Sequence, residues 1–249
     1  MTRFHLSLIV AALLGAAVWA SGHGLYWPAV LILLFVFTAL GVIFPEMRWF
    51  GPIVCTGKTD RRWVALTFDD GPDPRSTPAL LDLLKTARIP ATFFCIGNRI
   101  DAHPELAAQI VREGHLLQNH SYTHSYRMNL FSRARLRDEL SRTQIAIKKT
   151  TGRDSNWYRP PMGLTNPRIF RVARSLGLAV IGWNARSLDT KITQPEKILA
   201  RIERRLQPGG IILLHDGNIP VERLLPTVKM LLDRLNALGY EVVRLDQML

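Results

Sequence analysis

Residues 63–72 read WVALTFDDGP, and this stretch is the clearest guide to the fold. Its first six residues suit a strand that is buried on both faces of a parallel sheet. Two adjacent carboxylates, Asp69 and Asp70, follow directly, and the pair Gly71-Pro72 then turns the chain. Neighbouring carboxylates in a partly buried position repel each other, so they need a cation, a proton or an arginine nearby. A capped turn explains the same residues, and this stretch alone leaves both interpretations open.

The remainder of the chain alternates between strands and helices. Six further strands are expected, at 91–96, 116–119, 157–159, 178–183, 211–214 and 240–245. Helices are expected at 77–87, from Pro104, from Ser132 to Gly152, from Asn166 to Gly177, at 195–206 and at 221–238. This alternation predicts an α/β domain with a largely parallel sheet, either open or closed into a barrel. The polar residues of interest follow the carboxyl ends of strands, where parallel folds build their sites.

A second polar motif lies at residues 119–124, which read NHSYTH. If this segment forms a helical turn, His120 and His124 lie on one face of it and can hold one divalent ion. The glutamate of the zinc-protease signature is absent between them. Together with an aspartate from residues 69–70, two histidines leave positions open for water and substrate, as a catalytic metal requires.

These stretches resemble the motifs of the polysaccharide deacetylase family, also called the NodB-homology domain or carbohydrate esterase family 4. Residues 67–72 resemble its first motif and 119–124 its second. Residues 159–163 (RPPMG) resemble the third, although Met162 replaces the usual aromatic residue, and 213–216 (LLHD) resemble the fifth. The resemblance covers about 62–249 and implies a distorted (β/α) barrel of about seven parallel strands.

The resemblance also implies roles for individual residues. The expected metal ligands, for a divalent ion that we expect to be Zn²⁺, are Asp70, His120 and His124. Asp69 is the expected general base, and Arg159 would pair with it and fix its orientation. His215 is the expected general acid. The expected substrate and oxyanion contacts are Met162, Trp183 and Leu214.

The fourth motif departs from the family pattern. Residues 183–190 read WNARSLDT, where the family has two aspartates followed by a tryptophan. Asp189 matches the second aspartate, which in the family supports the acid histidine, and it completes the expected catalytic group. Arg186 replaces the first aspartate and Thr190 replaces the tryptophan. The change is either drift in a loop or a sign that the substrate is not a polymeric chitin-like chain.

The first 45 residues form a separate apolar region. No Asp, Glu, Lys or Arg occurs between Phe4 and Pro45, and two apolar runs, 6–20 and 25–44, are separated by the residues SGHG. The second run is long enough to cross a hydrocarbon core of ~30 Å at ~1.5 Å per residue, whereas the first is marginal alone. A removable signal peptide is one interpretation. The second run, which a cleaved signal does not need, favours an uncleaved transmembrane hairpin.

A hairpin predicts three regions and a topology. The regions are a membrane anchor over 1–45, a juxtamembrane linker over 46–61 and a catalytic domain over 62–249. Both ends of a hairpin lie on one side of the membrane. Arg3 precedes it, four basic residues follow between 48 and 62, and the connecting turn has none. The positive-inside rule then places the domain on the cytoplasmic side of a bacterial-type inner membrane. If only one run spans, the domain faces the periplasm or the outside.

The formal charge of the 249-residue chain is +12. Much of it gathers in 127–153, where eight basic residues face two acidic ones. A solvated helix face explains such a run, but anionic lipid headgroups or a phosphate-bearing substrate are favoured, because they suit a domain tethered near a negatively charged leaflet. We expect no nucleic-acid partner, because no motif that reads nucleic acid accompanies the charge.

The expected function is a membrane-anchored, metal-dependent deacetylase. Its expected substrate is an N-acetylated or N-formylated amino sugar in a saccharide that a lipid carries, with membrane lipids as neighbours. Peptidoglycan or an exported N-acetylglucosamine polymer is the alternative if the domain faces outward. A non-catalytic saccharide-binding relative is an alternative of a different class, and it would be expected to lack Asp69, Arg159 or His215.

Overall fold

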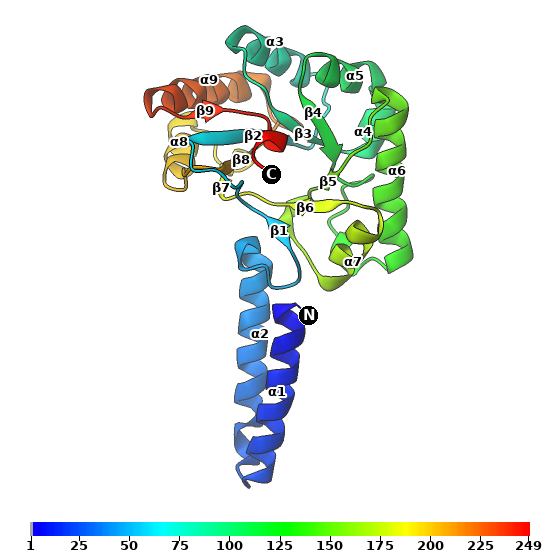
Figure 1. Ribbon diagram of the computed structural model, residues 1–249, viewed down its shortest axis with the longest axis vertical. Coiled ribbons are helices and arrows are strands. Elements are labelled where there is room, and N and C mark those ends of the chain that lie inside the picture. Colours follow the sequence, from blue (N-terminus) through cyan, green and yellow to red (C-terminus); the bar gives the residue numbers. More distant parts are fainter. Residues whose placement is uncertain (1) are drawn as a thin grey trace.

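A helical hairpin projects from an α/β domain in the computed structural model, which describes residues 2–249 (Figure 1). The hairpin consists of α1 (Arg3–Ala20) and α2 (Trp27–Ile43). Gly22, with φ of 75°, lies in the turn between them, a backbone conformation that glycine adopts without strain. Gly15 lets the helices approach, because a Cβ there would collide with the Trp27 ring.

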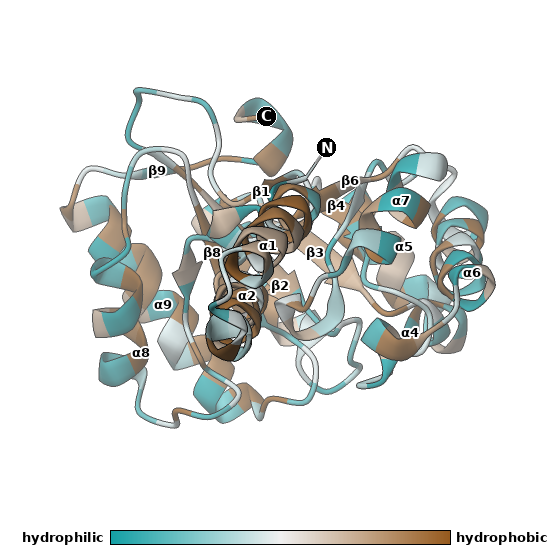
Figure 2. Ribbon diagram, turned by 90° about the horizontal axis from the view of Figure 1, so that it is seen from below, coloured by the Kyte–Doolittle hydropathy of each residue, from teal (hydrophilic) through white to brown (hydrophobic). Residues whose placement is uncertain are grey.

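The hairpin presents apolar side chains on most of its surface. Both helices are long and apolar enough to cross a membrane, and only 6% of each candidate span is buried. Viewed from below, the hairpin is almost entirely apolar, whereas the outer helices of the domain mix apolar and hydrophilic residues (Figure 2). A continuous exposed apolar surface of this kind is typical of a site that contacts lipid or another protein.

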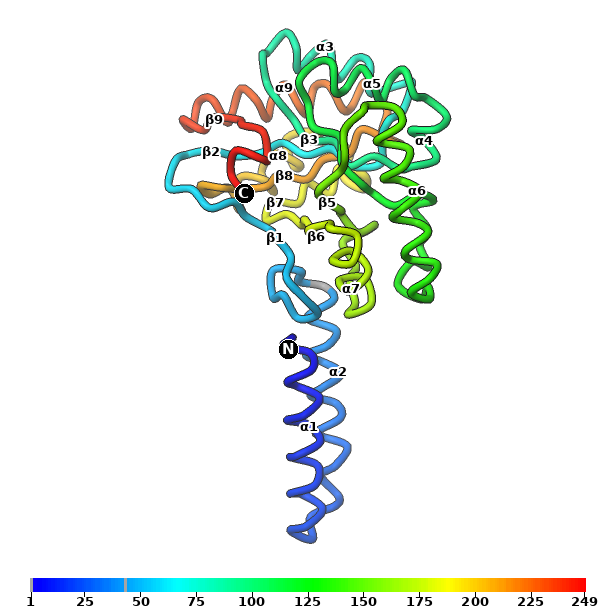
Figure 3. The backbone as a smooth tube through the Cα atoms, turned by 45° about the vertical axis from the view of Figure 1, so that its right-hand side comes forward, coloured from blue at the N-terminus to red at the C-terminus, as the bar shows by residue number. Residues whose placement is uncertain are grey.

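The hairpin is joined to the domain at the segment around Trp49. The Phe4 amide donates a hydrogen bond to the Trp49 carbonyl at 2.9 Å, and Phe37 stacks on the Trp49 ring with centroids 6.1 Å apart. Arg3 donates to the carbonyl of Met47 at 2.8 Å. These contacts place the start of α1 and the end of α2 beside the domain, with the turn between the helices far from it (Figure 3).

The domain is built on one sheet in which all paired strands are parallel, in the order β1-β6-β5-β4-β3-β2-β8-β7 with β9 beside β2. The strands are β1 (Ile53–Val54), β2 (Trp63–Asp69), β3 (Thr92–Cys95), β4 (Leu116–Asn119), β5 (Trp157–Tyr158), β6 (Ala179–Ile181), β7 (Ala185–Arg186), β8 (Gly210–His215) and β9 (Glu241–Val242). Within the described residues the sheet curls without closing by strand pairing. An antiparallel bridge between Thr56 and Gly210 spans the seam. The predicted α/β class with a parallel barrel-like sheet is confirmed.

Helices cover the outer face of this sheet. They are α3 (Thr77–Ala87), α4 (Gly97–Ala102), α5 (Pro104–Arg112), α6 (Arg133–Thr151), α7 (Pro167–Ser175), α8 (Pro195–Glu203) and α9 (Val221–Ala237). Local signals in the sequence define several ends. The Ser132 hydroxyl caps α6 by accepting from the Arg135 amide at 3.3 Å, and Gly152 ends that helix with φ of 70°. Asn166 caps α7 in the same way.

Two short strands and one helix were not expected from the sequence. Strand β1 lies inside the segment 46–61 that was expected to be a linker, so part of that segment belongs to the sheet. Strand β7 lies in the fourth motif, and α4 follows β3. Each of these strands has two residues, which is too short for hydrophobic alternation to show.

The central strand β2 carries the core of the domain. Leu66 is fully buried in the layer between the sheet and the helices. We expect Leu66→Ala to lower the free energy of unfolding by ~2–5 kcal/mol, because it leaves a cavity in a close-packed core. Ile145→Ala on α6 is the matched control, since Ile145 is 65% exposed, and it should change stability by less than ~0.5 kcal/mol. Urea unfolding of the detergent-solubilised chain measures both. Equal effects of the two substitutions would contradict this placement of the core.

Candidate active site

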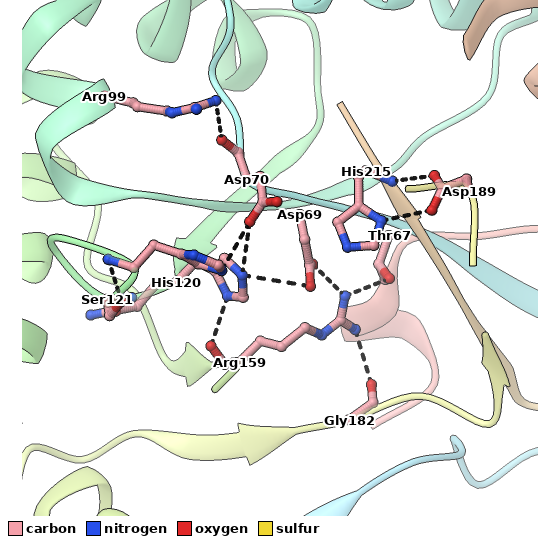
Figure 4. A network of polar contacts seen from close by, with 12 residues as sticks. Thr67, Asp69, Asp70, Arg99, His120, Ser121, Arg159, Gly182, Asp189 and His215 are labelled. Atoms are coloured by element: carbon pink, nitrogen blue, oxygen red, sulfur yellow. Dashed lines mark hydrogen bonds and ion pairs between the residues drawn. The ribbon is translucent and has the colours of Figure 1, made fainter. Parts of the chain in front are cut away.

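Parallel strands bring five polar side chains to one edge of the sheet (Figure 4). Asp69 ends β2, and Asp70 follows it directly. His120 follows β4, Arg159 follows β5 and His215 ends β8. Asp69 and His215 are register partners on adjacent strands. Residues that lie up to 146 positions apart in the sequence therefore meet because their strands end at the same edge.

Asp70, His120 and His124 form a set of three donors. One ligand atom from each lies within 4.8 Å of the others. The Asp70 Oδ1 atom is 3.1 Å from His124 Nε2 and 3.4 Å from His120 Nε2. This buried oxygen has no hydrogen-bond partner within residues 2–249, which is unusual for a buried carboxylate and is what a bound cation would satisfy. One carboxylate and two imidazoles are also a donor set that divalent zinc and related ions accept. The residues present therefore fit a divalent metal.

The two histidines are prepared for ligation. The Nδ1 atom of His120 lies 2.8 Å from the Arg159 carbonyl, so this nitrogen carries the proton and Nε2 keeps its lone pair. Burial and the neighbouring His120 lower the pKa of His124 to about 4, which leaves that ring neutral at physiological pH.

The histidine segment is not a helical turn, which corrects the expectation from the sequence. It is a loop in which Ser121 and His124 have positive φ values of 65° and 51°. The amides of Tyr122 and Thr123 donate to the buried carboxylate of Glu139 on α6, at 3.0 and 2.8 Å. Since these amides bond to a side chain, the i→i−4 ladder of a helix does not form. No sequence signal indicated this role of Glu139, which lies within a basic run.

Arg159 is fully buried and binds three acceptors. Its Nη1 donates to Asp69 Oδ1 and to Thr67 Oγ1, each at 2.7 Å. Its Nη2 donates to the Gly182 carbonyl at 2.9 Å. The other oxygen of Asp69 lies 3.7 Å from His120 Nε2, beside the donor set of Asp70. The guanidinium therefore fixes Asp69 with one carboxylate oxygen directed at the candidate metal position.

His215 is held by Asp189. Its Nδ1 atom lies 2.8 Å from Asp189 Oδ1, and its backbone amide donates to Asp189 Oδ2 at 2.8 Å. The Ser187 hydroxyl adds a hydrogen bond to Asp189, a contact that the sequence did not reveal. Burial would lower the pKa of His215, but Asp189 raises it, with help from Asp69 and Asp70, to about 9. His215 is thus protonated at neutral pH and can donate a proton.

Of the three residues expected to contact substrate or the oxyanion, Met162 and Trp183 lie together and Leu214 lies apart from them. Met162 lies in the 3₁₀ turn Pro161–Gly163 with φ of 58°, and the Trp183 ring packs against Gly163. The same ring lies 5.7 Å from the guanidinium carbon of Arg159. Leu214, in contrast, is fully buried in the helix-facing core. Side chains alternate along β8, so His215 points to the site and Leu214 away from it. This corrects the expectation that Leu214 contacts substrate.

Comparison with known proteins assigns the chain to a family. The family model described as polysaccharide deacetylase matches residues 56–181. A peptidoglycan-N-acetylglucosamine deacetylase of Bacillus cereus is 32% identical over 206 residues, covering 82% of this chain and 96% of that protein. The chain therefore belongs to the polysaccharide deacetylase family, and it is a hydrolase of an N-acetyl amide bond.

One further related sequence and one solved structure are similar to this chain. A chitooligosaccharide deacetylase of Bradyrhizobium sp. is 36% identical over 162 residues, which is 65% of this chain and 74% of that protein. The crystal structure of a family 4 carbohydrate esterase pseudoenzyme from Bacillus anthracis has a TM-score of 0.73 and 27% identity, covering 79% of this chain and 68% of that chain.

We expect the purified full-length chain to contain roughly one divalent ion, with open coordination positions. His120→Ala removes one ligand and should abolish most of the bound metal, as measured by mass spectrometry of the elements after dialysis. His103→Ala is the control, because His103 lies at the start of α5, outside the donor set. Equal metal content in the two variants would show that the ion binds elsewhere.

The pairing of His215 with Asp189 predicts a pH dependence. A protonated His215 is present below a pKa of about 9, so activity that needs this proton is lost as the pH rises through that value. Asp189→Asn removes the charge that raises the pKa. The alkaline limb of kcat should therefore move to lower pH by about one unit or more. A limb at the same pH in the variant and the wild type would rule out His215 as the titrating acid.

Proposed function

We propose that this protein is a metal-dependent N-deacylase with Asp69 as its general base and His215 as its general acid. The observation that supports this most strongly is the position of Asp69. Arg159 fixes it beside the Asp70, His120 and His124 donor set, and its register partner is His215. A base, a candidate metal position and an acid thus share one side of the barrel, as amide hydrolysis requires.

The residues divide the reaction between them. Asp70, His120 and His124 would hold a divalent ion, for which we propose Zn²⁺, and this ion would act as a Lewis acid toward the amide carbonyl and the attacking water. Asp69 accepts the proton of the attacking water, and Arg159 keeps its carboxylate oriented. The backbone near Met162 offers an N–H to the developing oxyanion. His215, held by Asp189, donates a proton to the departing amine, leaving a free amino sugar and a carboxylate.

The proposed setting is a membrane. The two apolar helices would anchor the chain through region 1–45, and 62–249 would be the catalytic domain, to whose sheet strand β1 of the segment 46–61 also belongs. Arg171 and Arg174 lie with His5 around a pocket at the base of the hairpin, which suits contact with anionic headgroups. We propose a bacterial-type cytoplasmic membrane with the domain on the cytoplasmic side, and a lipid-linked saccharide with an N-acetyl or N-formyl group as substrate.

A polymer substrate is the second candidate. The relatives are named as deacetylases of peptidoglycan and of chitooligosaccharides, and this favours a glycan on the outer side of the membrane. The similarity to a pseudoenzyme from Bacillus anthracis suggests a further alternative, a saccharide-binding protein without activity. Against that, this chain holds Asp69, Arg159 and His215 in contact with their partners.

A screen for acetate release tests the proposed activity. Lipid-linked, oligomeric and polymeric N-acetyl sugars are offered to the metal-loaded, full-length chain, with Asp69→Asn as the blank. We expect release from at least one substrate, and a loss of ~10²-fold or more in the variant, because the positioned base is removed. If no substrate releases acetate above the blank, a binding protein is the better description.

A reporter fused after Leu249 tests the proposed side of the membrane. A fluorescent reporter that folds in the cytoplasm should be active, and an alkaline phosphatase fusion should be inactive. An active phosphatase on the intact chain would place the domain outside and would favour the polymer substrate.

A further inference from the structure

A cationic cavity lies between the end of the hairpin and the domain. Its volume is about 630 Å³, within the range of ligand-binding pockets. Four arginines line it: Arg186, Arg201, Arg204 and Arg205. Arg186 comes from β7, and the others from the end of α8 and the residues that follow it. Arg201, Arg204 and Arg205 are also close in the sequence, which reads RIERR over 201–205, and Arg186 joins them in the fold.

These arginines lack anionic partners. None of the four forms an ion pair within residues 2–249. The buried Nε of Arg201 has no hydrogen-bond partner in the same range. Glu46 is the one carboxylate in the lining, so four guanidinium groups face a single negative charge. Partial burial and the charge of Arg201 lower the pKa of the half-open Arg186 side chain, whereas the charge of Asp189 raises it. An anion would relieve the repulsion between Arg186 and Arg201.

The cavity shares a wall with the candidate active site. Met162, Gly163 and Trp183 line it, and Trp183 is the ring that lies near Arg159. The guanidinium carbon of Arg186 lies 5.6 Å from the centre of the same ring. Only two residues separate Arg186 from Asp189, which holds His215. A group bound to the arginines thus lies close to the sugar whose amide is cleaved.

The opposite wall belongs to the hairpin. Val42, Phe44 and Pro45, at the end of the second apolar helix, also line the cavity. If α2 spans the membrane, this wall lies at the depth of the lipid headgroups. The cavity therefore offers a cationic centre, an apolar side toward the bilayer and a side toward the active site.

We infer that this cavity is a subsite for a phosphate or diphosphate ester, the group that joins the amino sugar of the substrate to its lipid. Guanidinium groups bind phosphate oxygens through paired hydrogen bonds, which suits a site with four of them. The lipid chain would leave along the apolar wall, and the sugar would extend past Trp183 to the donor set. The inference rests on the proposed deacylase function, because that function defines where the sugar lies.

Binding is tested first without any turnover. Inorganic diphosphate is titrated into metal-free, detergent-solubilised full-length protein by calorimetry, so that it cannot bind through the metal. We expect one site per chain, weakened about tenfold or more in Arg186→Gln/Arg201→Gln. Arg204→Gln/Arg205→Gln, at exposed positions, serves if the first variant does not fold. The control, Arg133→Gln/Lys149→Gln, removes the same charge from α6 and should bind as the wild type does. No binding, or an equal loss in the control, overturns the subsite.

Turnover then identifies the source of the phosphate. Kinetics are compared for a diphosphate-linked polyprenyl N-acetylglucosamine and for chitotetraose, in nanodiscs of phosphatidylcholine. In Arg186→Gln/Arg201→Gln, KM for the diphosphate-linked substrate should rise about tenfold or more relative to the wild type, whereas KM for chitotetraose should change little. An effect that needs added phosphatidylglycerol would assign the cavity to membrane headgroups and overturn the inference. If neither substrate is cleaved while diphosphate binds as expected, the proposed function fails and the anion site stands.

Discussion

The buried ion pair between Arg159 and Asp69 is the interaction on which the site depends. A buried charge is costly unless its partners are complete, and a fully buried arginine is rare. Here the guanidinium donates to Asp69, Thr67 and Gly182 and lies 4.0 Å from the centre of the Phe94 ring, while its buried Nε has no hydrogen-bond partner within residues 2–249. The backbone carbonyl of Arg159 accepts a hydrogen bond from His120. One residue thus orients the candidate base and sets the tautomer of a candidate ligand.

The parallel sheet makes this arrangement possible. Each strand ends at the same edge, so short loops after β2, β4, β5 and β8 deliver carboxylates, imidazoles and a guanidinium to one place. The seam between the two ends of the sheet has a separate role. The chain crosses it from β6 to β7, and Trp183 and Arg186 lie on that crossing, between the site and the base of the hairpin. The fold therefore places the end of α2 on one wall of a cavity whose other wall, with Met162 and Trp183, adjoins the candidate active site.

The sequence predicted those helices and strands that a local cap or a long apolar run marks. The strand that ends in Asp69, the capped helix from Ser132 to Gly152 and the apolar hairpin were all predicted, because periodicity and caps mark them. It did not predict the short strands β1 and β7, nor the loop form of the histidine segment. Those features depend on contacts with distant residues, as the bonds from Glu139 to that segment show. The arginine cavity was missed for the same reason, since Arg186 and the hairpin wall join Arg201, Arg204 and Arg205 only after folding.

The substitution Arg159→Lys, with acetate release and metal content measured together, tests the central claim most directly. Lysine keeps the charge but cannot serve the three separated acceptors of the guanidinium. If the ion pair positions the base, the variant should still bind a divalent ion and should lose ~10²-fold or more in kcat with little change in KM. A folded, metal-loaded Arg159→Lys protein with a kcat close to that of the wild type would contradict the account.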